Sequence, residues 1–116
     1  MNSPLGRHML LELYQCPDNI LDSIPAIEKN LLDIVDKINA TFVSKSFHHF
    51  SPHGVSGVVV IAESHITIHS WPEHNYAAID VFTCDESIDY KLVEDLMVEK
   101  FKSKKHQAQT IKRGEV

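Results

Sequence analysis

Residues 58–73 have the sequence VVVIAESHITIHSWPE. The β-branched apolar run at its start is typical of a strand, and after Glu63-Ser64-His65 the chain continues at once as an alternating strand that ends at Trp71. Two strands this close in sequence leave almost no room for a loop. The junction at Glu63-Ser64 is therefore either an ordinary tight hairpin or a backbone held under strain for a chemical purpose.

Hydrophobic spacing predicts the elements on either side of this hairpin. Before it we expect a strand over 7–14, a helix within 18–40 with Ser23 as cap and Pro25 in its first turn, and a strand over 41–50. After it we expect a strand over 76–84, a helix capped by Asp85 or Ser87, and a short strand near 107–111. The buried stripe expected on that second helix is Ile88, Leu92, Leu96, Met97 and Phe101. This order predicts an α+β fold, a two-layer sandwich in which one antiparallel sheet carries both helices on one face.

Composition limits the class of protein. With 116 residues, 43% of them hydrophobic, the sequence predicts one domain over 1–116. There is no apolar run of about 18 residues and no signal-peptide pattern, so we expect a cytoplasmic protein without a membrane segment. A net charge of -5 argues against nucleic-acid binding, and the basic residues near the C-terminus are interpreted as a solvated face. The two cysteines, Cys16 and Cys84, are expected to be free thiols.

Period-two alternation separates the two faces of the predicted sheet. Ile66 and Ile68 share the face expected to meet the helices, and Ile79 and Val81 continue it on the next strand. The other face carries aromatic, histidine, acidic and cysteine side chains: His65, Thr67, His69, Trp71, Asp80, Phe82 and Cys84. Such a face is too apolar for bulk water and too polar for an ordinary core. A second copy of the sheet is the simplest cover, and a half-exposed sheet with scattered aromatics is the alternative.

Six of the eight histidines lie between His48 and His74, which raises the question of a metal site. On an extended strand His65 and His69 share a side but lie about 13 Å apart, too far for one zinc ion. Neither an HxH pair nor an HExxH helix occurs, so no metal is expected unless loops fold back to build a site. A Cys84–His69 pair acting as nucleophile and base is a further enzymatic hypothesis that spacing leaves open.

Two contiguous motifs carry a family resemblance. ESHITIHSWPE at 63–73, followed by YAAIDVFTC at 76–84, resembles the signature of the bacterial and archaeal S-adenosylmethionine decarboxylases. The flanking motifs agree with it: GRH at 6–8, FHHF at 47–50 and GVSGVVV at 54–60. The resemblance spans nearly the whole chain.

The resemblance implies a proenzyme that cuts itself between Glu63 and Ser64. In that family the serine hydroxyl attacks the preceding carbonyl, the ester eliminates, and hydrolysis leaves a pyruvoyl group where Ser64 stood. The products would be a β chain of residues 1–63 and an α chain of residues 64–116. Serine suits this chemistry because its side chain can form the ester and then lose its oxygen. The junction would then be both a tight hairpin and a strained turn.

The resemblance also implies the roles of individual residues. The pyruvoyl ketone would condense with the amine of S-adenosylmethionine and accept the electrons released with carbon dioxide, giving the aminopropyl donor for spermidine biosynthesis. Cys84 resembles the proton donor of this reaction, and His69 with Ser56 resembles the pair that assists processing, with His69 as proton acceptor. Phe50, Trp71 and Glu73 resemble substrate-binding positions of the family. The two aromatic residues would stack on the adenine, and Glu73 would bind the ribose hydroxyls. Asp85 departs from the family, which usually has glycine after the cysteine.

Strand geometry adds a prediction about assembly. Ser64 and His69 are five residues apart, so on one straight strand they lie about 16 Å apart on opposite faces. We therefore expect a two-fold dimer that packs sheet on sheet in an αββα arrangement, with Ser64 and Cys84 from one chain and Phe50, Ser56, His69 and Glu73 from its partner. Two alternatives remain at this point: a pyruvoyl-dependent arginine or ornithine decarboxylase, and an unprocessed, non-catalytic homologue.

Overall fold

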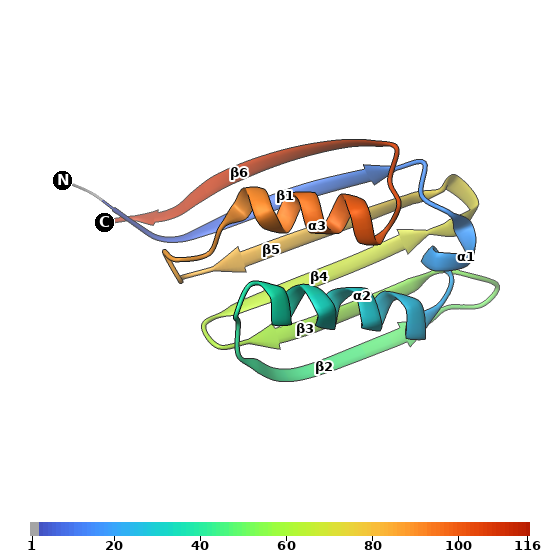
Figure 1. Ribbon diagram of the computed structural model, residues 1–116, viewed down its shortest axis with the longest axis horizontal. Coiled ribbons are helices and arrows are strands. Elements are labelled where there is room, and N and C mark those ends of the chain that lie inside the picture. The colour runs from blue at the N-terminus through green and yellow to red at the C-terminus, as the bar shows by residue number, and fades with distance from the viewer. Residues whose placement is uncertain (1–2) are drawn as a thin grey trace.

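The computed structural model describes residues 3–116 and shows a six-stranded antiparallel sheet in the order β2-β3-β4-β5-β1-β6 (Figure 1). This confirms the predicted α+β class. Among the described residues no helix is long and apolar enough to span a membrane. The elements in chain order are β1 (Pro4–Tyr14), α1 (Asp18–Leu21), α2 (Ile24–Lys37), β2 (Phe42–His49), β3 (Val55–Ile61), β4 (Ser64–Trp71), the 3-10 turn η1 (Pro72–His74), β5 (Tyr76–Thr83), α3 (Tyr90–Lys100) and β6 (Lys105–Glu115).

Helices α2 and α3 lie side by side over one face of the sheet (Figure 1). The apolar side chains of α2 at helical spacing, Ile27, Leu31 and Ile34, are fully buried against it. On the strands the buried positions alternate, as expected for a sheet covered on one side. Burial of this kind is the main favourable contribution to stability, about 1.5–3 kcal/mol for each large apolar side chain. The strand residues in this core are Met9, Leu11, Leu13, Val55, Val59, Ile61, Ile66, Ile68, Ala77, Ile79 and Val81.

The first long helix begins where the sequence predicts. Ser23 caps α2 by accepting a hydrogen bond from the N–H of Ala26 (3.1 Å), and Pro25 lies in the first turn. An N-cap serine satisfies one of the N–H groups that a helix start leaves free, and proline lacks an N–H to lose.

The second helix begins later than predicted. Its cap is Asp89, which accepts from the N–H of Leu92, whereas Asp85 and Ser87 bond to each other in the preceding turn. This start places Val93 in the core and leaves Leu92 39% exposed, so the expected stripe was wrong at Leu92. Asp85, Ser87 and Asp89 are all residue types that cap helices, and only packing selects among them.

The last strand is longer than predicted. β6 pairs with β1 from Tyr14↔Lys105 to Pro4↔Glu115 at the edge of the sheet. All of its residues are exposed, so it has no apolar alternation by which the sequence could reveal its length.

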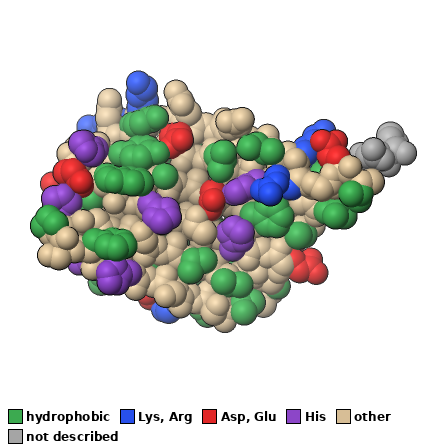
Figure 2. Space-filling model, turned by 180° about the vertical axis from the view of Figure 1, so that it is seen from behind, with side chains coloured by type: hydrophobic (Ala, Val, Ile, Leu, Met, Phe, Trp, Pro, Cys, Tyr) green, Lys and Arg blue, Asp and Glu red, His purple; other side chains and the backbone are tan. Residues whose placement is uncertain are grey.

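The predicted division of β4 and β5 into two faces is confirmed. Ser64, Ile66, Ile68 and Ser70 are buried under the helices, and the intervening residues of β4 point to the other face. Seen from that side, the molecule shows hydrophobic and histidine side chains gathered on an open sheet surface, with a few charged groups among them (Figure 2).

Candidate functional site

The junction between β3 and β4 is a two-residue turn, Ala62-Glu63, between the paired residues Ile61 and Ser64. Glu63 has φ = 63°, in the left-handed region that side-chain-bearing residues rarely adopt. A residue held there costs of order 1–3 kcal/mol, which the surrounding ladder must offset. The junction is therefore a tight hairpin and a strained turn at once, as the sequence led us to expect.

Ser64 and Glu63 are both held by the end of β5. The Ser64 hydroxyl is buried and donates to Oγ1 of Thr83 at 2.5 Å, and the carbonyl of Glu63 accepts the N–H of Cys84 at 3.2 Å. This arrangement follows from the ladder, in which Ser64 pairs directly with Thr83. Three predicted site groups thus meet at one end of the sheet: the Ser64 hydroxyl, the Glu63–Ser64 bond and Cys84, whose side chain is exposed.

Thr83 was missed by sequence reasoning, although a signal for it existed. In two adjacent antiparallel strands joined by a short turn, the first residue of one lies opposite the last residue of the other. Counted back from Trp71 and Tyr76, the residues on either side of the turn, this rule pairs Ser64 with Thr83, seven residues along each strand.

Asp85, the residue that departs from the family pattern, has its carboxylate hydrogen-bonded within its own turn. Its backbone N–H donates to Oγ1 of Thr83 (2.9 Å), and its carboxylate accepts from the N–H (2.8 Å) and hydroxyl (2.6 Å) of Ser87. These hydrogen bonds, the Ser87 hydroxyl first, lower the pKa of Asp85, so the side chain is an anion at neutral pH. Nearby, burial raises the pKa of Tyr90, whose hydroxyl lies 3.3 Å from the carbonyl of Arg7.

A second group of predicted site residues lies at the other end of β4. Ser56 and His69 are directly opposite each other on β3 and β4, with Oγ and Nδ1 2.8 Å apart. Trp71 is two residues further along, 6.4 Å from the His69 ring, and is 41% exposed. Phe50, just after β2, is 48% exposed, and Glu73 in η1 pairs with His53 at 3.1 Å.

The two groups do not meet within one chain. Ser64 faces the helices and His69 faces outward, about 16 Å along the same strand at roughly 3.3 Å per residue. His69 pairs with Ala78, six residues before Cys84, or about 20 Å along β5. A Cys84–His69 nucleophile and base within one chain is therefore wrong.

The turn that carries Phe50 is anchored by a residue that sequence reasoning did not select. Oδ1 of Asp22 accepts from the N–H of Gly54 (2.9 Å) and lies 2.8 Å from Nε2 of His49. The Gly54 hydrogen bond, followed by that of His49, lowers the pKa of the Asp22 carboxyl. Gly54 has φ = 110°, which favours glycine, and its carbonyl accepts the N–H of Phe50 at 2.8 Å. The bonds at both ends of this turn fix the strand end that presents Phe50.

An aromatic row extends the second group across the outer face. The rings of Trp71 and Tyr76 stack at 5.4 Å, and Tyr76 stacks on Tyr14 at 5.3 Å. The Tyr76 hydroxyl donates to Glu12, and burial, with this hydrogen bond second, raises the pKa of Tyr76. Tyr76 is thus a neutral donor that holds the row in place.

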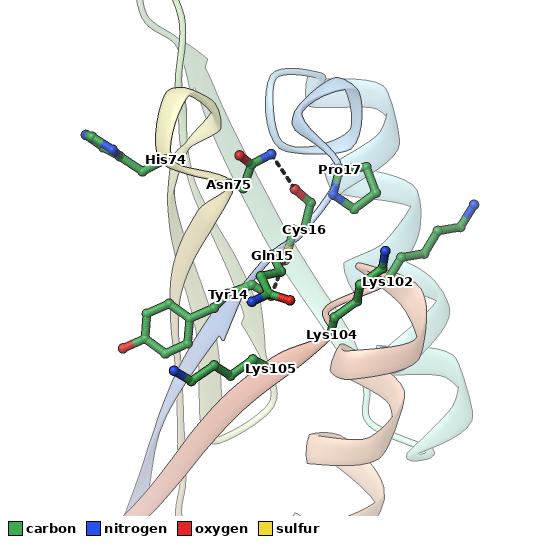
Figure 3. A pocket seen from close by; sticks show the side chains of 9 residues that line it. All are labelled: Tyr14, Gln15, Cys16, Pro17, His74, Asn75, Lys102, Lys104 and Lys105. Carbon is green, nitrogen blue, oxygen red and sulfur yellow. Dashed lines mark hydrogen bonds between the residues drawn. The ribbon is translucent and has the colours of Figure 1, made fainter.

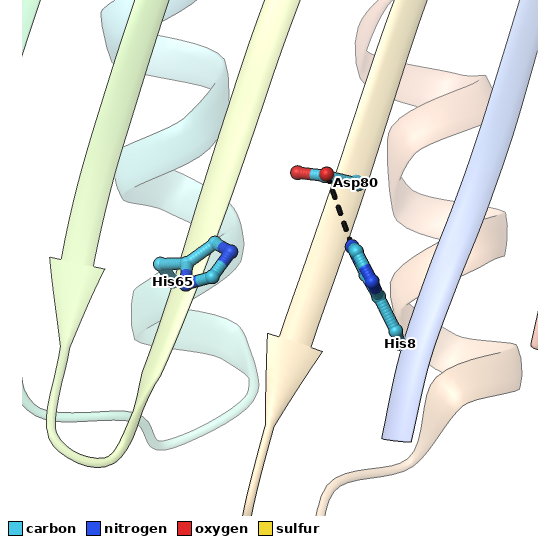
Figure 4. A group of neighbouring side chains, drawn as sticks. All are labelled: His8, His65 and Asp80. Carbon is cyan, nitrogen blue, oxygen red and sulfur yellow. Dashed lines mark hydrogen bonds and ion pairs between the residues drawn. The ribbon is translucent and has the colours of Figure 1, made fainter. Parts of the chain in front are cut away.

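Three side chains on neighbouring strands could geometrically hold a metal ion. His8, His65 and Asp80 place their ligand atoms within 4.8 Å of one another (Figure 4). Sequence spacing missed this group because its members come from β1, β4 and β5. Two imidazoles and a carboxylate suit a transition metal.

Hydrogen bonds already occupy two members of this group, His8 and Asp80. Nε2 of His8 is 3.0 Å from Asp80, and Nη1 of Arg113 is 3.3 Å from Nδ1 of His8. Because arginine can only donate, Nδ1 accepts and Nε2 carries the proton that it donates to Asp80. In that tautomer Nε2 has no lone pair for a metal. The expected absence of a metal stays a prediction.

A large hollow lies at the end of the sheet away from Ser64. It has a volume of about 710 Å³ and is lined by residues from the ends of β1, η1 and β6, with Lys102 and Lys104 extending outward (Figure 3). The β1–β5 ladder places Tyr14 at the opposite end of the sheet from Thr83. The hollow lined by Cys84 and Tyr90 has only about 10 Å³. The hollow beside Cys84 is therefore much smaller than the hollow at the opposite end of the sheet.

A family model described as S-adenosylmethionine decarboxylase matches residues 7–114. The chain belongs to the S-adenosylmethionine decarboxylase family. It is 47% identical to the S-adenosylmethionine decarboxylase proenzyme of Thermodesulfovibrio yellowstonii, over 95% of this chain and 82% of that protein. It is 44% identical to the proenzyme of Pseudomonas aeruginosa, over 95% of this chain and 69% of that one.

A solved structure of the family has the same fold. The crystal structure of the adenosylmethionine decarboxylase from Aquifex aeolicus superimposes with a TM-score of 0.89 at 37% identity, covering 98% of this chain and 94% of that one. The resemblance to S-adenosylmethionine decarboxylases and the predicted sheet with its helices on one face are both confirmed.

Proposed function

We propose that this chain is a proenzyme that cuts itself between Glu63 and Ser64 and then decarboxylates S-adenosyl-L-methionine, supplying the aminopropyl donor for spermidine biosynthesis. The observation that carries the proposal is the strained Glu63–Ser64 turn, whose hydroxyl and carbonyl are both held by the end of β5. Family membership supports the same reaction.

Self-cleavage needs a nucleophile, a polarised carbonyl and a base. In the first step Oγ of Ser64 bonds to the Glu63 carbonyl carbon, the C–N bond breaks, and the hydroxyl proton ends on the freed amino nitrogen. The N–H of Cys84 is placed to stabilise charge on the Glu63 oxygen. In the second step the ester eliminates, which requires removal of the Ser64 Cα proton. His69 is the proposed base.

The two fragments would remain associated. Fragment 1–63 contains β1, β2 and β3, and fragment 64–116 contains β4, β5 and β6. The ladders β3–β4, β1–β5 and β1–β6 all join one fragment to the other. Cleavage therefore severs one turn and leaves a shared sheet and core intact.

Decarboxylation rests on the group formed from Ser64. A pyruvoyl group supplies a ketone that binds the substrate amine and withdraws electrons as carbon dioxide leaves. The exposed Cys84 thiol, next to the junction at the end of β5, is the proposed donor of a proton to the substrate α-carbon. Phe50 and Trp71 are the proposed aromatic surfaces for adenine and for the sulfonium cation, and Glu73 is the proposed acceptor of hydrogen bonds from the ribose hydroxyls.

The site is proposed to be composite, because its two halves lie at opposite ends of β4. A two-fold axis that lies between the two sheets, parallel to them and perpendicular to the strands, would bring the outer faces together with their strands reversed. The His69 end of one chain would then lie over the Ser64 end of the other. Such a dimer would also cover the open face seen in Figure 2. A base arriving from that face is suited to the Cα proton, because the Ser64 hydroxyl is turned toward the helices.

The purified protein is expected to run as two small bands and to release carbon dioxide from S-adenosylmethionine, and not from arginine or ornithine. Phe50, Trp71 and Glu73 favour S-adenosylmethionine over those two amino acids, because arginine and ornithine have no adenosyl group for them to bind. Labelled carbon dioxide from each of the three substrates is the measurement. If carbon dioxide is released only from arginine or ornithine, the protein is a decarboxylase of that amino acid. If the protein runs as a single uncut band, it is an unprocessed, non-catalytic homologue.

Phe50→Ala is expected to raise KM for S-adenosylmethionine by roughly tenfold to a hundredfold while self-cleavage proceeds normally, because stacking on a base contributes about 1–3 kcal/mol. Phe42→Ala is the matched control, since Phe42 is 45% exposed at the other end of β2. Steady-state kinetics give KM for both variants. Equal KM values for Phe50→Ala and Phe42→Ala would contradict the role of Phe50.

A further inference from the structure

Thr83 is a buried polar residue whose position is fixed from two sides. It is 2% exposed, and its Oγ1 accepts from the Ser64 hydroxyl at 2.5 Å and from the N–H of Asp85 at 2.9 Å. The ladder places it directly opposite Ser64. A buried hydroxyl usually has such partners, but here one partner is the proposed nucleophile itself.

This contact restricts the chemistry of Ser64. A serine side chain has three staggered rotamers, and a free hydroxyl would sample them. Donation to Thr83 selects one rotamer and directs the hydroxyl proton toward Thr83, so the lone pairs of Oγ point elsewhere. Meanwhile the next residue, Cys84, binds the Glu63 carbonyl oxygen through its N–H. Two consecutive residues thus hold the two reacting groups of the junction.

We propose that Thr83 is a positioning residue for self-cleavage, which orients the Ser64 hydroxyl for attack on the Glu63 carbonyl carbon. This inference rests on the proposed function. The bonds formed and broken are those of the first step described above. Thr83 has the same protonation state before and after that step, because the hydroxyl proton of Ser64 ends on the freed amino nitrogen. Asp85 contributes through its backbone N–H, which keeps Oγ1 of Thr83 in place whatever the side chain at position 85.

The test compares Thr83→Val, which preserves shape and removes the hydroxyl, with Thr83→Ser, which preserves the hydroxyl. The half-time of self-cleavage is followed on a gel in newly made protein. We expect Thr83→Val to be slower by roughly tenfold to a hundredfold, the effect of one hydrogen bond to a reacting group, and Thr83→Ser to remain within about threefold of wild type. Equal rates for Thr83→Val and wild type would overturn the inference.

Hydroxylamine identifies the step at which Thr83 acts, because it cleaves esters and leaves ordinary peptide bonds intact. If Thr83 orients the attack, uncut Thr83→Val protein contains no ester, and hydroxylamine gives no additional fragments. Rapid cleavage by hydroxylamine would mean that the ester forms and elimination fails, which overturns the role in attack.

Two controls distinguish a loss of positioning from a loss of folding. Thermal unfolding of each variant in the Ser64→Ala background shows whether the fold persists. If Thr83→Val does not fold, Thr83→Ala, which cannot overfill the site, takes its place in the same comparison. A wild-type protein that does not cut itself would contradict the proposed function, whereas a wild type that cuts at the same rate as Thr83→Val contradicts only the role of Thr83.

Discussion

Ser64→Ala is expected to leave the chain as a single band near 13.2 kDa with decarboxylase activity at background. Alanine lacks the oxygen that forms the ester, so neither fragment nor pyruvoyl group can arise. Because the proposed electron acceptor is the group made from Ser64, the loss should equal the whole catalytic acceleration, on the order of a millionfold or more. Gel electrophoresis and carbon dioxide release measure the two parts separately.

Stability should change little in the same variant. Ser64→Ala removes one hydrogen bond to Thr83, which still accepts the N–H of Asp85, so we expect a loss of about 1 kcal/mol. Ser46→Ala is a matched control, an exposed serine on β2, and it should be cut and active. Complete cleavage of Ser64→Ala at the same bond would contradict the mechanism.

Mixing Ser64→Ala chains with His69→Ala chains is expected to restore cleavage that neither variant shows alone. In a mixed dimer one composite site combines the intact Ser64 of one chain with the intact His69 of the other. Random pairing makes half of the dimers mixed, so about a quarter of all chains should be cut at most. The cut chains should be those that carry His69→Ala, which mass spectrometry of the fragments can establish.

The opposite result would be equally informative. If His69 served its own chain, no chain in the mixture would be processed, because each variant lacks one essential group. Mixing Ser64→Ala with the double variant Ser64→Ala/His69→Ala is the control, since it contains no intact Ser64 and must remain uncut. Unfolding and refolding the two chains together ensures exchange of partners.

Much of the fold could be predicted from the sequence because its signals are local. Alternation over 64–71 assigned each side chain of β4 to a face, and the Ser23–Pro25 pattern located the start of α2. Where several local signals compete or none exists, prediction failed: three possible caps preceded α3, and the fully exposed β6 lacked apolar alternation. Packing against the rest of the sheet decides those cases.

The sequence by itself identified the candidate residues of the site, since its resemblance to the family rests on contiguous motifs that contain a serine after a tight turn, a cysteine and a histidine. It also placed Ser64 and His69 on opposite faces, because parity along a strand needs no tertiary information. Only the tertiary structure showed that Thr83 and the N–H of Cys84 hold the Ser64 hydroxyl and the Glu63 carbonyl, and that His8, His65 and Asp80 meet. Those contacts join strands distant in sequence, and the register that creates them is set by the packing of the whole sheet against its two helices.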